Sequence, residues 1–131
     1  MQPRTQAILL VDDERMVLTF LETVLNSAGY RVYTACDAEH ALEVLQSPVQ
    51  IDLLITDVVM PGIDGFELAA MARFLRPRLP VVSICAWPGN PQIRGKEALV
   101  LAMLVKPFTP GELLATVDTA VGIAACSAAA S

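Results

Sequence analysis

The sequence has no cluster of basic residues, and its acidic residues outnumber its basic ones. Nine Lys and Arg against fourteen Asp and Glu give a net charge of −5. Proteins that bind nucleic acids use Lys and Arg to replace the counterions of the phosphates. The composition therefore argues against direct nucleic-acid binding by this chain. The acidic balance also gives no reason to expect attachment to a membrane surface.

The sequence is also poor in cysteine and histidine and has no long apolar run. Cys36, Cys85 and Cys126 are odd in number and match no spacing of metal ligands. The longest apolar run, residues 98–105, has eight residues and is too short to cross a bilayer. With no signal peptide at the polar start, we expect a soluble, cytoplasmic protein with reduced cysteines. The only histidine, His40, lies between Glu39 and Ala41 in an expected helix and is predicted to be a solvated surface residue.

Apolar residues make up 54% of the 131 residues, which excludes disorder and predicts one domain with a real core. We expect a tail over residues 1–6, a domain over 7–121 and an Ala/Ser-rich, frayed tail over 122–131. Short apolar runs predict strands, and apolar residues at helical spacing between them predict helices. The strands are expected at 7–11, 31–35, 51–55, 80–86 and 102–105, and the helices at 17–28, 38–45, 65–75, 91–99 (weak) and 110–121. This alternation predicts an α/β fold, a doubly wound parallel sheet covered on both faces.

Charged side chains follow three of these strands. Asp12 and Asp13 follow the first, Asp57 the third and Lys106 the fifth. Parallel strands end at one edge of the sheet, where open α/β sheets bind ligands. If the three strands are near neighbours, the carboxylates repel one another more than one lysine can compensate. Oxygen ligands without Cys or His then predict Mg²⁺.

Such a site is suited to phosphoryl transfer. Asp57 can act as the nucleophile that becomes an acyl phosphate, while the metal and Lys106 neutralise charge on the phosphoryl oxygens. A Mg²⁺-dependent phosphatase is disfavoured, because no second acid or histidine is placed to activate water. Asp57 could also merely solvate a strand end.

Four motifs on this frame closely resemble those of a bacterial response-regulator receiver domain. They are VDDE at 11–14, TD at 56–57, MPGIDG at 60–65 and KPF at 106–108. The resemblance covers about residues 7–121 and implies a flavodoxin-like fold with five helices and strand order 2-1-3-4-5.

The resemblance also implies the roles of individual residues. Asp57 would accept phosphate from a sensor histidine kinase or a phosphotransfer protein. Asp13, Asp57 and the Val59 carbonyl would ligate Mg²⁺, with Asp12 completing the site, directly or through water. Lys106 would contact the phosphoryl group and form a cis peptide bond to Pro107. Output would pass to a downstream protein, or to a second copy, through the last helix, the weak fourth helix and the fifth strand.

The sequence departs from the family pattern where the signal is usually transmitted. Cys85 stands before Ala86 where the family usually has Ser or Thr, and Met103 stands where it usually has an aromatic residue. Cys85 and Ala86 are expected to contact the phosphoryl group, although a thiol donates poorly to a phosphoryl oxygen. Met103 is expected to flank the site as a switch residue. Ser83, two residues earlier on the same side, offers an alternative register. Trp87 is expected to flank the site and shield the acyl phosphate.

These departures leave two functions open. The first is a phosphorylation-controlled switch. The alternative is a receiver-like interaction module whose phosphorylation switching is weakened or lost.

Overall fold

The protein is a five-stranded parallel sheet with helices on both faces, as the computed structural model shows for residues 6–60, 62–86 and 100–130. The strands are β1 (Ala7–Val11), β2 (Arg31–Ala35), β3 (Leu53–Asp57), β4 (Val81–Cys85) and β5 (Ala102–Val105). Their order is β2-β1-β3-β4-β5, and every neighbouring pair is parallel. The predicted fold class and strand order are confirmed.

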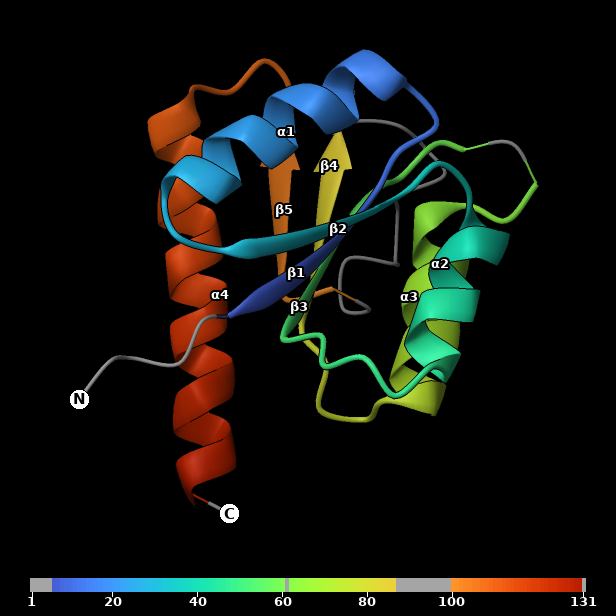
Figure 1. Cartoon of the computed structure of the whole chain (residues 1–131), viewed down its shortest axis with the longest axis vertical. Coiled ribbons are helices and arrows are strands. Elements are labelled where there is room, and N and C mark those ends of the chain that lie inside the picture. Colours follow the sequence, from blue (N-terminus) through green and yellow to red (C-terminus); the bar gives the residue numbers. More distant parts are fainter. Residues whose placement is uncertain (1–5, 61, 87–99, 131) are drawn as a thin grey trace.

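The helices are α1 (Arg15–Ser27), α2 (Ala38–Gln46), α3 (Gly65–Leu75) and α4 (Pro110–Ala130). α1 and α4 cover one face of the sheet, and α2 and α3 cover the other (Figure 1). The central strands are buried on both faces because alternate side chains enter the two apolar clusters. In β3, for example, Leu54 packs with the α2 and α3 side, while Leu53 and Ile55 pack with the α1 and α4 side.

The described residues hold four helices where the sequence predicts five. The expected weak helix at 91–99 lies outside the described residues. α4 runs to Ala130, although the sequence predicts a frayed tail from residue 122. Alanine has the highest helix propensity of all residues, so this Ala-rich stretch continues the helix.

β3 begins two residues later than the sequence predicts, and it ends at Asp57, the residue that the sequence places at the strand end. Pairing with β4 extends to this residue, because Thr56 lies opposite Ser83 and Asp57 opposite Ile84. Asp57 is therefore held by the sheet itself, at the last position of a buried strand. No helix in the described part of the chain is both long enough and apolar enough to span a bilayer.

Candidate functional site

Three carboxylates meet at the C-terminal edge of the sheet. Each of Asp12, Asp13 and Asp57 offers an oxygen within 4.8 Å of the others. Asp12 and Asp13 follow β1, and Asp57 ends the neighbouring strand β3. The sequence predicts this cluster if the strands are neighbours, and the strand order makes them so.

Asp12 is the most deeply buried member of the cluster. Its side chain is 1% exposed, and its Oδ1 accepts a hydrogen bond from the Glu14 N–H at 2.9 Å. Its Oδ2 is buried and has no hydrogen-bond partner. Burial raises the pKa of Asp12 to about 6, and the negative charges of Asp57 and Asp13 add to this effect. The site therefore holds a carboxylate oxygen with no partner in the protein.

Asp57 is 8% exposed and lies near the positive charge of Lys106 and the negative charge of Asp13. Burial is the largest influence and raises the pKa of Asp57, while Lys106 and the Val59 N–H act to lower it. Lys106 also acts to lower the pKa of Asp12. The Lys106 ammonium group therefore acts on both buried acids, but it does not cancel the effect of burial.

The arrangement fits a divalent cation. The unpaired Asp12 Oδ2 and the two neighbouring carboxylates form an all-oxygen set, which is the donor chemistry that Mg²⁺ prefers. Asp13 is exposed, which leaves one side of the cluster open to water. Val59 is 57% exposed beside Asp57, where its carbonyl is the expected fourth protein ligand.

The start of α3 approaches the end of β3 very closely. The Gly65 N–H donates to the Val58 carbonyl at 2.8 Å. A Cβ added to Gly65 would lie 2.2 Å from the Asp57 carbonyl oxygen and 2.9 Å from the Val58 Cα. Only glycine fits here, so Gly65 positions the strand end that carries Asp57. Sequence reasoning missed this role, and the only signal was a glycine directly after the Asp64 cap.

Asp64 caps the N-terminus of α3, the same helix end that Gly65 begins. Asp64 Oδ1 accepts from the Glu67 N–H at 2.8 Å, and the Glu67 side chain accepts from the Asp64 N–H at 3.4 Å. This is the predicted capping box. It fixes the first turn of α3 against the strand end.

Cys85, Ala86 and Lys106 lie at the ends of β4 and β5. Cys85 is buried at 3% exposure, whereas Ala86 is exposed. The Lys106 N–H donates to the Cys85 carbonyl at 2.8 Å, which joins the two strand ends. The Lys106–Pro107 peptide bond is cis, as the resemblance implies.

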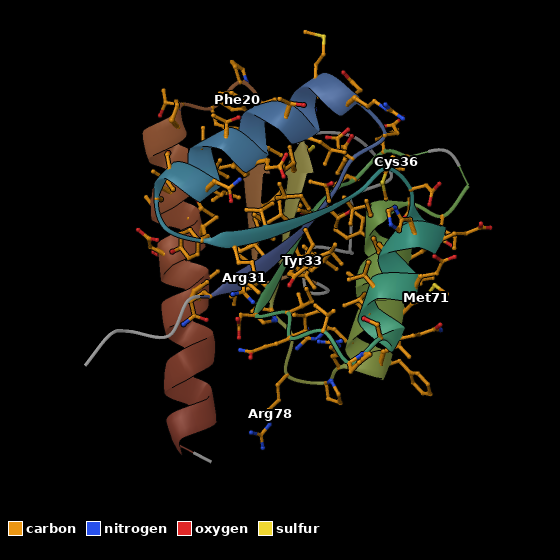
Figure 2. The ribbon with its side chains drawn as sticks, viewed as in Figure 1. Phe20, Arg31, Tyr33, Cys36, Met71 and Arg78 are labelled. Carbon is orange, nitrogen blue, oxygen red and sulfur yellow. The ribbon has the colours of Figure 1, made fainter. Side chains whose placement is uncertain are left out.

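Met103 is partly buried and packs against the apolar cluster on the α2 and α3 side. Trp87 lies outside the described residues, so its expected position beside the site stays a prediction. His40, on α2, is exposed, as the sequence predicts. Cys36 is an exposed free thiol just after β2 (Figure 2).

Comparison with known proteins identifies close relatives. Residues 8–118 match the family described as "Response regulator receiver domain". The chain is 38% identical over 109 residues to the response regulator MprA of Mycobacterium ulcerans, covering 82% of this chain and 47% of that protein. It is 34% identical over 111 residues to the alkaline phosphatase synthesis transcriptional regulatory protein PhoP of Bacillus subtilis, covering 84% and 46%. The chain thus spans about half the length of these relatives.

Solved structures agree with this match. The Vibrio cholerae chemotaxis protein CheY4 superposes with a TM-score of 0.82 at 30% identity, covering 89% of this chain and 99% of that one. A receiver domain protein of Methanospirillum hungatei superposes with a TM-score of 0.86, covering 95% and 99%. Its identity of 24% supports the fold alone.

Proposed function

The chain belongs to the response regulator receiver domain family, and we propose that Asp57 accepts a phosphoryl group from a histidine kinase in a Mg²⁺-dependent reaction. A phosphotransfer protein is an equivalent donor. The observation that carries the proposal is the meeting of Asp12, Asp13 and Asp57 at one sheet edge, with Lys106 close to the two buried acids. The protein is then a signalling switch controlled by phosphorylation.

The chemistry follows from the positions of these side chains. A carboxylate oxygen of Asp57 attacks phosphorus, the P–N bond of the phosphohistidine breaks, and the freed imidazole of the donor takes a proton from solvent. Lys106 neutralises charge on the transferred phosphoryl oxygens, and its link to the Cys85 carbonyl holds it at the strand end. Mg²⁺, when bound by Asp12, Asp13, Asp57 and the Val59 carbonyl, supplies further positive charge to those oxygens.

The protein is a phosphoacceptor rather than a hydrolase under this proposal. His40, the only histidine, is exposed on α2 and is not a member of the carboxylate cluster, so we do not assign it as a base for attacking water. We therefore assign at most self-catalysed phosphotransfer and slow loss of phosphate to the chain. We place it in the cytoplasm, where kinase donors and reduced thiols such as Cys36 and Cys85 are found.

Labelling by acetyl phosphate tests the proposal. Asp57→Asn keeps the shape of the side chain and removes its nucleophilic charge, so we expect the wild type to take up one phosphoryl group and the variant to take up none. Asp52→Asn is the matched control, because Asp52 precedes the opposite end of β3, where it accepts a hydrogen bond from the Ala7 N–H. Equal uptake by wild type and Asp57→Asn would show that Asp57 is not the acceptor.

The alternative, an interaction module without phosphorylation switching, is favoured by one observation. Cys85 places a buried thiol where a hydroxyl would donate to the phosphoryl group. Labelling identifies a module that takes up no phosphate, and a melting temperature that does not change on labelling identifies one that takes it up without responding. In either case we place the output in protein contacts of α4 and β5, with a downstream partner or a second copy of the chain.

A further inference from the structure

The hydroxyl group of Ser83 is buried in the core and has no hydrogen-bond partner. Within the described residues, Ser83 Oγ and Asp12 Oδ2 are the buried side-chain oxygens without a hydrogen-bond partner. Asp12 belongs to the carboxylate cluster, where a cation would satisfy it. Ser83 is 0% exposed in the middle of β4 and has no such explanation. An unpaired buried hydroxyl lowers stability, so its presence in this state requires a reason.

The register of the sheet places Ser83 between two residues that matter to the site. Thr56 lies directly opposite it on β3, and Met103 lies directly opposite it on β5. Strand alternation puts all three on the α2 and α3 side of the sheet, the face to which Leu54, Val81 and Met103 contribute. A continuous row therefore runs from the neighbour of Asp57 to a partly buried methionine at the sheet edge.

The first member of this row is already bonded to the acceptor residue. Thr56 Oγ1 donates to the Asp57 carbonyl oxygen at 3.0 Å, and Thr56 is 0% exposed. A hydroxyl oxygen has two lone pairs, so Thr56 Oγ1 can still accept a hydrogen bond. Neighbouring strands lie about 4.8 Å apart, so a change of the Ser83 rotamer can bring its Oγ within hydrogen-bond distance of Thr56 Oγ1 on the paired strand. Ser83 is thus an unpaired donor beside an acceptor that is tied to Asp57.

We propose that Ser83 is a positioning residue of the switch, unpaired in the unphosphorylated protein and donating to Thr56 Oγ1 when Asp57 carries a phosphoryl group. This inference rests on the proposed function. A ligand shifts an equilibrium only through its different affinity for the two states, and the Cys85 thiol contributes little to that difference. A Ser83 hydroxyl that is hydrogen-bonded in only one state supplies the difference in free energy between the two states. Because Met103 lies opposite Ser83, the rearrangement of Ser83 changes the surroundings of Met103.

Thermal melting in two states tests the proposal. The states are the free protein and the protein with Mg²⁺ and beryllofluoride, which stands in for the phosphoryl group on Asp57. In the free protein Ser83→Ala removes an unsatisfied donor, and we expect the melting temperature to rise by about 3 °C or more. With beryllofluoride the same substitution removes a formed bond, and we expect the rise to disappear or reverse. An equal rise in both states would overturn the proposal.

Two further variants separate hydrogen bonding from packing. Thr56→Val removes the acceptor, and in that background Ser83→Ala is expected to have the same effect in both states, as in a double-mutant cycle. Thr34→Val removes a hydroxyl from β2, outside the row, and serves as the control with no dependence on state. A dependence on state that survives Thr56→Val would assign the effect to a partner other than Thr56 and overturn the pairing.

The methyl resonance of Met103 gives the readout that a purely structural role would not change. In protein labelled at the methionine methyl groups, with Met103 assigned by Met103→Leu, we expect beryllofluoride to shift this resonance. The shift should be at least halved in Ser83→Ala and kept in Ser83→Thr, which retains the hydroxyl. An unchanged shift in Ser83→Ala overturns the inference alone. Absence of acetyl phosphate labelling in the wild type overturns the proposed function and the inference with it.

Discussion

At the residue scale, the stability of the protein depends on whether the buried carboxylate of Asp12 carries a proton. Burial raises the pKa of Asp12 to about 6, from an ordinary value of 3.8. Between these two pH values the folded protein keeps a proton that the unfolded chain releases. Raising the pH through this interval therefore lowers the free energy of unfolding, and the loss is complete above pH 6. A shift of this size corresponds to about 3 kcal/mol at most.

Removing this titration should flatten the pH dependence. In EDTA, the free energy of unfolding of the wild type should fall as the pH rises from 4 to 7. For Asp12→Asn we expect this fall to be smaller by about 1–3 kcal/mol. Denaturant unfolding at several pH values measures it. Glu43→Gln, which removes an exposed carboxylate from α2, is the control and should follow the wild type. Parallel curves for wild type and Asp12→Asn would contradict the prediction.

A second residue-scale prediction concerns the thiol of Cys85. Replacing it with a hydroxyl of similar size gives the phosphoryl group a better donor at the end of β4. We expect Cys85→Thr to bind beryllofluoride about five- to tenfold more tightly, since a neutral hydrogen bond contributes about 1 kcal/mol or slightly more. Titration followed by the Met103 methyl resonance measures the affinity. Cys36→Ser, at an exposed thiol after β2, is the matched control, and equal affinities for all three proteins would remove the role of Cys85.

At the element scale, the acceptor is positioned by the contact between the end of β3 and the start of α3. Gly65 allows the helix backbone to reach the Asp57 carbonyl, and the Asp64 and Glu67 capping box fixes the first helical turn. We expect Gly65→Ala to destabilise the fold by more than 2 kcal/mol. The added Cβ would lie 2.2 Å from the Asp57 carbonyl oxygen, and the backbone of β3 would have to shift to relieve this clash. Chemical denaturation measures this loss.

Gly122→Ala is the control for that substitution. Gly122 lies within α4, and a Cβ there would meet nothing within 4 Å. Alanine should therefore stabilise the helix by about 0.5–1 kcal/mol. Similar effects of Gly65→Ala and Gly122→Ala on stability would show that the backbone at the end of β3 leaves room for a side chain at Gly65.

The elements themselves could be predicted well from the sequence where local chemistry decides them. The bounds of β1, β2, α3 and β5 agree with the predicted ranges, because apolar runs mark the strands and the Asp64 cap marks the start of α3. Agreement fails where pairing or propensity decides the bounds. β3 begins at Leu53 and not at Ile51, and α4 continues to Ala130 through a stretch without apolar periodicity.

At the scale of the whole molecule, the site exists only because of the strand order. The sequence shows that Asp12, Asp13, Asp57 and Lys106 follow strands, but local patterns do not say which strands are neighbours. The order β2-β1-β3-β4-β5 places β1 beside β3 and so brings the three carboxylates together. The resemblance to receiver domains predicts this order, while the Ser83 row depends on the register of three strands and could not be read from one of them.

The carboxylate cluster links metal binding to the stability of the whole fold. Without metal, Asp13→Ala relieves repulsion on Asp57, so we expect this variant to melt at a higher temperature than the wild type in EDTA. With Mg²⁺ at about ten times its dissociation constant, binding should stabilise the wild type by about 1.4 kcal/mol, or roughly 4 °C in melting temperature. The variant lacks a ligand and should gain much less, which brings the wild type level with it or above it.

The pH sharpens this test. Below the pKa of Asp12, near 6, protons compete with the cation, so the gain from Mg²⁺ should shrink from pH 7 to pH 4.5. NaCl at matched ionic strength controls for screening. A gain from Mg²⁺ that is equal in wild type and Asp13→Ala would show that the cation does not bind at the carboxylate cluster but elsewhere on this acidic protein.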